Sequence, residues 1–221
     1  MSESEAWNAA AHDWAHRIRE GMGGRVHLHD ASIYELLPPP RGLTLDVGCG
    51  EGRLTRELSA RGYEVVGVDA STALVEEARS ADPSGRYEVA SIDSLPFADG
   101  AAGLAVCVNV LPHVDDLQAA GAELARVLAP GGAFLIGTIH PVAQAGTYDE
   151  ESGELTITDY WNREREAVEL GEHTVHHERR TIEDYLRTLL GAGFVLTALR
   201  EVPGPSGKLP LYLDLLLTRS P

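Results

Sequence analysis

Lysine is nearly absent from this chain. Lys208 is the one lysine among 18 basic residues, so most chemistry that depends on a lysine side chain is excluded. Cysteine is also scarce: Cys49 and Cys107 lie in or beside apolar, strand-like runs, which indicates buried, reduced thiols rather than a disulfide framework. No apolar run approaches the roughly 18 residues that a membrane-spanning helix requires. The first residues are polar and acidic, unlike a targeting signal. We therefore expect a soluble, uncleaved, cytoplasmic protein.

Acidic residues outnumber basic ones by 34 to 18, which gives a formal net charge of −16. Such a surface repels nucleic acids and anionic membranes, so neither is expected as a partner. The acids are concentrated in residues 149–172, which contain nine acidic residues and two basic ones, Arg163 and Arg165. This cluster is either a solvated face or a feature that favours a cationic substrate. A neutral or cationic small molecule is the expected substrate.

The pattern of elements predicts an α/β protein. Five short apolar strands alternate with helices of about 10–14 residues, which is typical of crossover connections and a parallel sheet covered on both faces. The expected strands are 43–47, 63–68, 86–90, 103–108 and 133–139. The expected helices between and after them are 53–61, 71–80 and 115–128, and residues 130–132 are expected to form a turn.

The two ends of the chain differ from this alternating core. Residues 1–37 are predicted to be helical, with a second short helix at 30–37 that stops at Pro38. A helix is expected at 181–190, capped by Thr181 and Glu183. Strands expected at 194–201 and 209–218 form an antiparallel pair at the edge of the sheet.

The predicted fold is one domain with a doubly wound, mostly parallel, seven-stranded, Rossmann-like sheet and an antiparallel C-terminal edge strand. Within residues 1–221 we distinguish an N-terminal helical cap (1–40), a cofactor-binding core (41–140), a lid-like insertion (141–180) and the C-terminal helix and edge strands (181–221).

A glycine-rich loop follows the first predicted strand. Gly48 and Gly50 match the start of a dinucleotide-binding G-x-G-x-x-G motif, but Arg53 occupies the third position and the last glycine, Gly52, comes one residue early. Asp46 precedes the loop by two residues, and its carboxylate suits an ammonium group better than a phosphate. The loop therefore indicates a cofactor that approaches the backbone closely but is not a dinucleotide.

Asp69 ends the second predicted strand, 19 residues beyond Gly50. A carboxylate at this position can accept hydrogen bonds from both ribose hydroxyls of a dinucleotide or of an adenosyl ligand. Its alternative role is to cap the next helix, for which Ser71 is also available. Asp69 thus supports nucleoside binding without choosing the ligand.

Four segments together resemble a known family. In order and spacing, residues 46–52 (DVGCGEG), 67–71 (GVDAS), 94–97 (SLPF) and 127–132 (VLAPGG) resemble the class I S-adenosylmethionine-dependent methyltransferases, in particular the group of ubiquinone and small-molecule methyltransferases. The resemblance is close over residues 43–140 and looser at Leu189–Phe194. It implies a Rossmann-like fold, S-adenosylmethionine as cofactor and S-adenosylhomocysteine as product.

The resemblance also implies where the parts of the cofactor lie. Gly48, Gly50 and Gly52, with Asp46 and Cys49, would surround its methionine portion; Asp69 would bind the ribose, and Ala70 would adjoin the adenosine. Ser91 stands where many members have an aspartate that contacts adenine, with Asp93 two residues later, and Ile92 would pack on the adenine ring. Asn109, Val110 and Leu111 match the stretch beside the sulfonium. Trp7 to Trp14 resembles a helix that closes over the methionine end, although these tryptophans could instead pack that helix on the sheet.

Methyl transfer is an in-line displacement that needs a general base only when the acceptor atom must lose a proton. His140 and His113 follow predicted strands at the carboxyl edge of the sheet and are the first candidates for that base. His113 also has a structural interpretation in the family. His176 and His177 could reach the site if the insertion folds back. With His173 they form a weak metal-like cluster, but no further ligand completes it, so no metal is expected.

The insertion is expected to select the substrate. Its aromatic residues Tyr148, Tyr160 and Trp161 suit a cover over an apolar ligand. The predicted activity is transfer of a methyl group to an O, N or C atom of a small molecule.

Three other functions compete with methyl transfer as interpretations of this sequence. A short-chain dehydrogenase would need a Tyr-x-x-x-Lys pair, whereas Lys208 precedes Tyr212. A nucleic-acid amino-methyltransferase would need Asn-Pro-Pro-Tyr, whereas Asn109 is followed by Val110 and Leu111. A non-catalytic module that binds S-adenosylmethionine is the remaining alternative, because the base is not identified by sequence.

Overall fold

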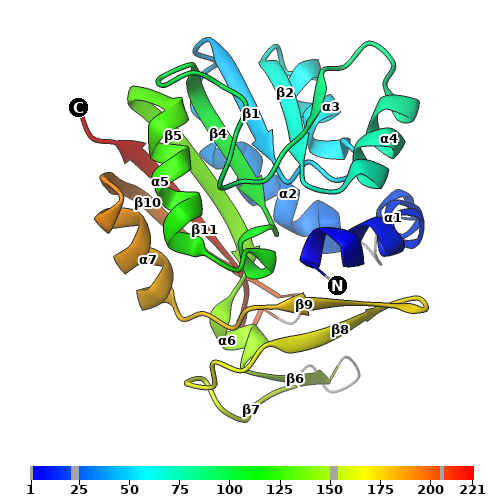
Figure 1. Ribbon diagram of the computed structural model, residues 1–221. Coiled ribbons are helices and arrows are strands. Elements are labelled where there is room, and N and C mark those ends of the chain that lie inside the picture. The colour runs from blue at the N-terminus through cyan, green and yellow to red at the C-terminus, as the bar shows by residue number, and fades with distance from the viewer. Residues whose placement is uncertain (1, 21–24, 150–153, 205–206) are drawn as a thin grey trace.

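The computed structural model describes residues 2–20, 25–149, 154–204 and 207–221. Its main feature is a seven-stranded sheet with the order β10-β11-β5-β4-β1-β2-β3 (Figure 1). The strands β3, β2, β1, β4 and β5 run parallel to one another. The strand order reverses between β1 and β4, and ligands bind in the crevice at such a point, beyond the carboxyl ends of the strands.

Strands and helices alternate through the core as the sequence predicts. The strands are β1 (Leu43–Val47), β2 (Glu64–Asp69), β3 (Tyr87–Val89), β4 (Ala102–Val108) and β5 (Leu128–Ile139). The helices are α3 (Arg53–Ala60), α4 (Thr72–Ala81) and α5 (Leu117–Val127), with the short 3-10 helix η2 (Leu111–His113) after β4.

The turn expected at 130–132 lies inside β5 instead of before it. β5 pairs with β4 through Ala102 and Leu128 and again through Leu104 and Ala133, so residues 129–132 bulge from the ladder. Gly131 has a φ of 75° there, a conformation that glycine adopts without strain.

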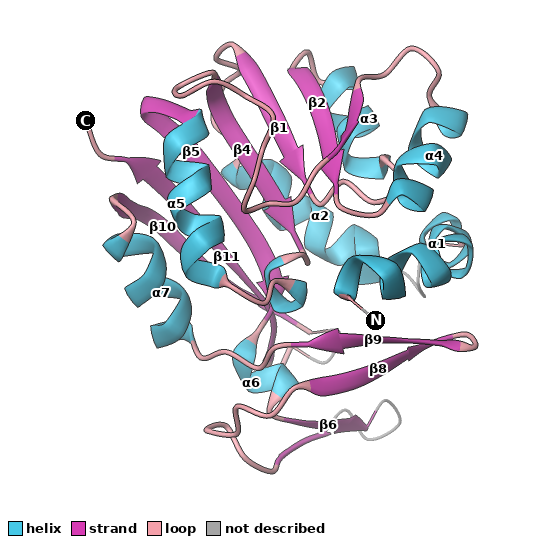
Figure 2. Cartoon of the chain, viewed as in Figure 1, coloured by secondary structure: helices cyan, strands magenta, loops and turns pink. Residues whose placement is uncertain are grey.

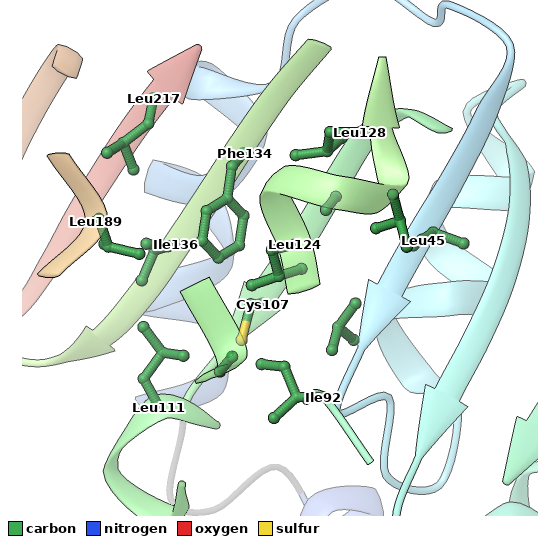
Figure 3. Packing of buried hydrophobic residues seen from close by; sticks show 14 of the residues in the cluster. Leu45, Ile92, Cys107, Leu111, Leu124, Leu128, Phe134, Ile136, Leu189 and Leu217 are labelled. Atoms are coloured by element: carbon green, nitrogen blue, oxygen red, sulfur yellow. The ribbon is translucent and has the colours of Figure 1, made fainter. Parts of the chain in front are cut away.

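Helices cover both faces of the sheet (Figure 2). On one face, α5 and α7 (Ile182–Gly191) pack on the strands around Cys107, Phe134 and Ile136 (Figure 3). On the other face, α2 (Arg25–Leu36) and α3 pack through Ile33 and Leu58. Burial on both faces explains why the central strands are almost continuously apolar. Cys49 and Cys107 are buried free thiols, as expected.

The antiparallel pairing predicted at the C-terminal edge is confirmed. β11 (Pro210–Arg219) lies between β5 and β10 (Phe194–Pro203) and runs antiparallel to both. The helix before this pair, α7, has Thr181 as its N-cap, but the reciprocal partner is Asp184 and not the predicted Glu183. The correction follows from geometry, since the side chain that reaches back to the cap stands three residues after it.

The N-terminal region forms two helices, α1 (Glu3–Arg19) and α2. Ser2 caps α1 in a capping box with Glu5. α2 is longer than expected, because it begins at Arg25 rather than at residue 30. No helix within the described ranges is both long and apolar enough to cross a membrane.

The insertion contains more regular structure than its sequence predicts. After α6 (Pro141–Gln144) come two antiparallel hairpins, β6 (Gly146–Asp149) with β7 (Glu154–Ile157), and β8 (Glu166–Leu170) with β9 (His173–His177). Figure 1 shows β8, β9 and α1 beyond the edge of the sheet at which β1, β2 and β4 end. Several of the clustered acids are exposed, namely Glu154, Asp159, Glu164, Glu169 and Glu172.

Candidate functional site

A cavity of about 810 Å³ lies at the carboxyl ends of β1, β2 and β4. Its walls come from α1, α2, the loops after these three strands, the insertion hairpin β8–β9 and the start of β11. Ten of the eleven residues predicted to bind the cofactor line it: Asp46, Gly48, Cys49, Gly50, Asp69, Ala70, Ser91, Ile92, Asn109 and Val110. The structure therefore brings these ten predicted residues together around one cavity.

The glycine loop is held by the neighbouring strand. The backbone N–H groups of Gly48 and Cys49 both donate to the carbonyl oxygen of Val68, at 2.7 and 3.0 Å. Gly48 and Gly50 have φ angles of 77° and 55°, which glycine adopts without strain. A Cβ at Gly48 would also overlap the Val110 side chain, so the turn brings the backbone against the cavity wall.

Gly52 is the predicted cofactor residue that does not line the cavity. It is the N-cap residue of α3 with a φ of 83°. A Cβ there would meet Tyr87 at 2.9 Å and Ala78 at 3.0 Å. The geometry gives Gly52 a packing function between α3, α4 and β3.

Asp69 connects the two loops that flank the cavity. Its Oδ2 accepts a hydrogen bond from the N–H of Gly50 and its Oδ1 accepts one from the N–H of Ser71, both at 2.8 Å. Burial raises the pKa of Asp69, and these two hydrogen bonds oppose that shift. Ser71 is the N-cap of α4, so Asp69 is free of that role. Each carboxylate oxygen can still accept a further hydrogen bond.

Asp46 is buried two residues before the glycine loop. Its Oδ2 accepts a hydrogen bond from Thr55 Oγ1 at 2.6 Å. Burial raises the pKa of Asp46 to about 6, against the opposing effects of Thr55 and Arg53. The carboxylate therefore carries its charge at neutral pH close to the loop, but at a cost in folding free energy.

Replacing Asp46 by asparagine should flatten the pH dependence of stability. Asp46 ionises near 3.8 in the unfolded chain and near 6 in the folded protein. The folded state therefore holds the proton more tightly, and this stabilising contribution falls by about 2 kcal/mol as the pH rises from 4 to 7. Urea unfolding across this range should show that fall in the wild type relative to Asp46→Asn. The exposed Asp99→Asn should behave like the wild type; equal slopes in all three would contradict the shift.

Asn109 has an unusual backbone conformation. Among the described residues it is the one non-glycine residue with a positive φ, at 57°. Its N–H donates to the carbonyl oxygen of Gly137 at 2.7 Å, and its buried Oδ1 has no hydrogen-bond partner within the described part of the chain. Strained residues with unmet polar atoms are concentrated at functional sites.

The cavity wall near residues 89–93 combines a buried apolar side chain with exposed polar ones. Ile92 is buried, whereas Ser91 and Asp93 are exposed at the cavity rim. Ile92 can thus offer an apolar surface to a flat ring, and Ser91 a hydroxyl at its edge.

Helix α1 covers the glycine loop. Trp7 and Trp14 line the cavity and contact each other edge to face, with ring centroids 5.4 Å apart. The helix is attached to the core because Asn8 Oδ1 accepts hydrogen bonds from Ser71 Oγ at 2.8 Å and from the N–H of Ala73 at 3.1 Å. The two tryptophans face the cavity and pack α1 against residues of the β8–β9 hairpin, not on the sheet as the alternative interpretation had it.

The aromatic residues of the insertion do not form the expected cover. Trp161 is 68% exposed, and it contacts Tyr160 away from the cavity lining. The side chain of Tyr148 lies outside the described residues. The side chains that close the cavity from the insertion are Val168 and Leu170, with others from β9, because these alternate inward along two hairpin strands.

His113 and His177 meet at the cavity wall. Their ring centroids are 4.4 Å apart, and Nδ1 of His113 contacts the carbonyl oxygen of His176 at 2.9 Å. A carbonyl can only accept, so Nδ1 carries the hydrogen and Nε2 holds the free lone pair. Burial and the neighbouring His113 lower the pKa of His177 to about 4, which leaves it neutral at pH 7.

His140 is directed to a structural position instead of the cavity. It is the N-cap residue of α6, with Nδ1 accepting from the N–H of Val142 and Nε2 lying 3.1 Å from Glu201 Oε1. It is buried and is not among the residues that line the cavity. Burial lowers its pKa despite Glu201. The position of His140 after β5 suggested a general base, but its ring instead caps the N-terminus of α6.

Replacing His140 by alanine should lower stability without lowering turnover. Loss of the α6 cap costs about 1 kcal/mol of unfolding free energy. Cofactor affinity and the methyl-transfer rate should match the wild type once both proteins are fully folded. Denaturant unfolding and a transfer assay measure the two effects. A reduced methyl-transfer rate with unchanged stability would contradict this prediction and indicate that His140 takes part in catalysis.

Two buried residues at the cavity were missed by the sequence analysis. His29 lines the cavity and its Nε2 contacts Asp214 Oδ1 at 2.8 Å. Asp214 is fully buried in β11. The available signal was a single acid inside an otherwise apolar strand, since charged residues are almost never fully buried unless they are paired. No cluster of three potential metal ligands occurs among the residues that the structure describes.

Comparisons with known proteins agree with this geometry. Residues 45–136 match the family described as a methyltransferase domain. An uncharacterised methyltransferase from Mycobacterium sp. (strain JLS) is 35% identical over 147 residues, covering 66% of this chain and 55% of the relative. A malonyl-[acyl-carrier protein] O-methyltransferase from Serratia marcescens is 35% identical over 131 residues, covering 59% and 49%. The chain thus spans about half the length of the curated relatives it matches.

A structural comparison supports the fold. A solved S-adenosylmethionine-dependent methyltransferase from Mesorhizobium loti aligns with a TM-score of 0.75 at 24% identity, covering 87% of this chain and 98% of that one. The predicted fold is confirmed. The match of residues 45–136 to a methyltransferase domain supports the predicted family, the class I S-adenosylmethionine-dependent methyltransferases.

Proposed function

We propose that this chain binds S-adenosylmethionine in the cavity beneath α1 and transfers its methyl group to a neutral or cationic small molecule. The observation that carries the proposal is the Asp69 carboxylate at the cavity wall, held by the N–H groups of Gly50 and Ser71. Its two oxygens keep acceptor capacity for the two hydroxyls of a ribose.

The donor set fits each part of this cofactor. Asp69 would bind the ribose and Ile92 would pack on the adenine, with Ser91 at its edge. Gly48, Gly50 and the charged Asp46 would surround the methionine end, where an ammonium group favours a nearby carboxylate. When bound, the cofactor supplies a methyl group on a positively charged sulfur. The protein aligns the acceptor with that group and excludes water.

The charge around the cavity supports a neutral or cationic acceptor. Eight acidic residues line it: Glu3, Asp30, Asp46, Glu51, Asp69, Asp93, Asp115 and Asp116. Arg17 and Arg53 are the arginines of the lining, and Arg53 is already paired with Asp30 through two hydrogen bonds of 2.7 and 2.9 Å. Outside the lining, Arg56 pairs with Glu51, and Arg165 pairs with Glu3 and Asp115. The remaining acids of the lining still give it a net negative charge, which attracts a sulfonium and repels a free carboxylate.

The acceptor end is bounded by aromatic side chains, which suit an apolar small molecule. Trp7 contacts His113 edge to face at 4.8 Å between ring centroids, and Tyr212 also lines the cavity. The name of the Serratia marcescens relative supports oxygen as the methylated atom. His113, with its free Nε2, is one candidate for the proton acceptor.

The substrate class can be tested with labelled cofactor. S-adenosylmethionine carrying a tritiated methyl group would be incubated with the protein and with sets of neutral, cationic and carboxylate small molecules. Label should enter neutral or cationic acceptors. Label that enters carboxylates alone would contradict the proposal. Binding of the cofactor without transfer to any set would also contradict it and would favour a carrier-linked substrate or a non-catalytic binding module.

Replacing Asp69 by alanine should weaken cofactor binding. The variant loses the ribose acceptors and leaves two N–H groups without their partner, so the binding free energy should fall by about 1–3 kcal/mol. Calorimetric titration with S-adenosylhomocysteine measures the change. Glu88→Ala, on the exposed face of β3, is the matched control and should bind as the wild type does. Equal affinity in Asp69→Ala would place the ribose elsewhere.

A further inference from the structure

A buried polar cluster lies beside the cavity between α2 and β11. Asp214 Oδ1 contacts His29 Nε2 at 2.8 Å, and Asp214 Oδ2 accepts a hydrogen bond from Ser32 Oγ at 2.5 Å. All three side chains are at least nine-tenths buried. The His29 ring stacks on Tyr212 with centroids 3.9 Å apart and planes 8° apart.

The register of the sheet places this cluster near Asn109, which lines the cavity after β4. Asp214 pairs with Gly137 of β5, and Gly137 pairs with Val108 of β4, one residue before Asn109. A Cβ on Gly137 would lie 2.7 Å from His29 Nε2, so the missing side chain leaves the space that the imidazole occupies. His29 and Asn109 therefore contact the same glycine from two sides.

The hydrogen bond to Asp214 fixes the tautomer that a neutral His29 ring adopts. The Asp214 carboxylate accepts the hydrogen of Nε2, so Nδ1 of the neutral ring holds a lone pair. Nδ1 is buried and has no hydrogen-bond partner among the described residues. Asn109 Oδ1 is in the same condition. Buried polar atoms are normally satisfied, and here the two unmet atoms are both acceptors at one end of a cavity.

We infer that His29 binds a neutral hydroxyl group of the methyl acceptor on the side of the cavity that Asn109 lines, and that His29 takes its proton. The inference rests on the proposed function and deepens it by naming the reacting group. A hydroxyl donates to Nδ1, whereas a carboxylate would set its lone pairs against that of Nδ1 and its charge near Asp214. The subsite thus selects a hydroxyl over a carboxylate.

The proton transfer balances with the methyl transfer. As the acceptor oxygen forms its bond to the methyl carbon, the carbon–sulfur bond breaks and its electron pair stays on sulfur. The O–H bond breaks and its proton goes to Nδ1 of His29. The resulting imidazolium is stabilised by the Asp214 carboxylate, while the next residue, Asp30, is already neutralised by Arg53.

The subsite can be tested with three probes of similar shape. Calorimetry first establishes that the wild type binds S-adenosylhomocysteine; absence of that binding would overturn the proposed function itself. The saturated protein is then titrated with 4-methylphenol, 4-methylanisole and 4-methylbenzoate. The phenol should bind about fivefold tighter than the anisole, the effect of one hydrogen bond, and the benzoate most weakly. Equal affinity for phenol and anisole, or a preference for benzoate, would overturn the subsite.

His29→Gln separates proton transfer from folding, because its Nε2–H can still donate to Asp214 while the basic nitrogen is lost. Its affinity for S-adenosylhomocysteine should match the wild type. Its rate of tritiated methyl transfer to 4-methylphenol should fall about 100-fold. His12→Gln, an exposed control on α1, should keep the rate. A wild type that binds the phenol without methylating it, or a loss of rate in His113→Asn but not in His29→Gln, would overturn the assignment.

Discussion

The carboxylate of Asp69 holds together the two loops on which the site depends. It joins the glycine loop after β1 to the start of α4 after β2 through two N–H groups. The Oγ of Ser71, at the end of this connection, accepts the N–H of Leu74 in the first turn of α4 and donates to Asn8 of α1. One side chain at the end of β2 thus positions the loop, the helix that follows and the helix that covers the cavity. A buried carboxylate is costly unless it is hydrogen-bonded, and here the partners are backbone groups that any ligand would approach.

The cover over the cavity is built from segments far apart in the sequence. Trp7 and Trp14 of α1 pack with Val168, Leu170 and Val175 of the β8–β9 hairpin into one small apolar cluster. The N-terminal helix and the insertion therefore form a single roof, and neither could bury these side chains alone. Exclusion of water from a charged reaction centre follows from this apolar closure.

The core and the cofactor walls could be predicted because their signals are local. A short apolar strand, a glycine loop and an acid at the end of the next strand stand close together in the chain, and parallel strands bring their carboxyl ends to one edge. The bulge at residues 129–132 was missed because Pro130 and two glycines have the composition of a turn. The strands of the insertion were missed because each is short and polar.

The histidine that we propose as proton acceptor could not be chosen from sequence for a physical reason. His140 stands at the correct edge, but its ring caps the helix that begins there. His29 is held in place by Asp214, 185 residues away, and fits over Gly137 because that residue has no side chain. Contacts of this kind arise from register and helix packing, which no short motif specifies. The lone acid in β11 was the one local sign of them.

Calorimetric titration of the purified protein with S-adenosylhomocysteine, with NADH as the control, tests the central claim most directly. The account predicts one site per chain with micromolar affinity for the sulfur ligand and no heat of binding from NADH. Binding of NADH with similar affinity, or no binding of S-adenosylhomocysteine, would contradict the assignment of this cavity as the cofactor site.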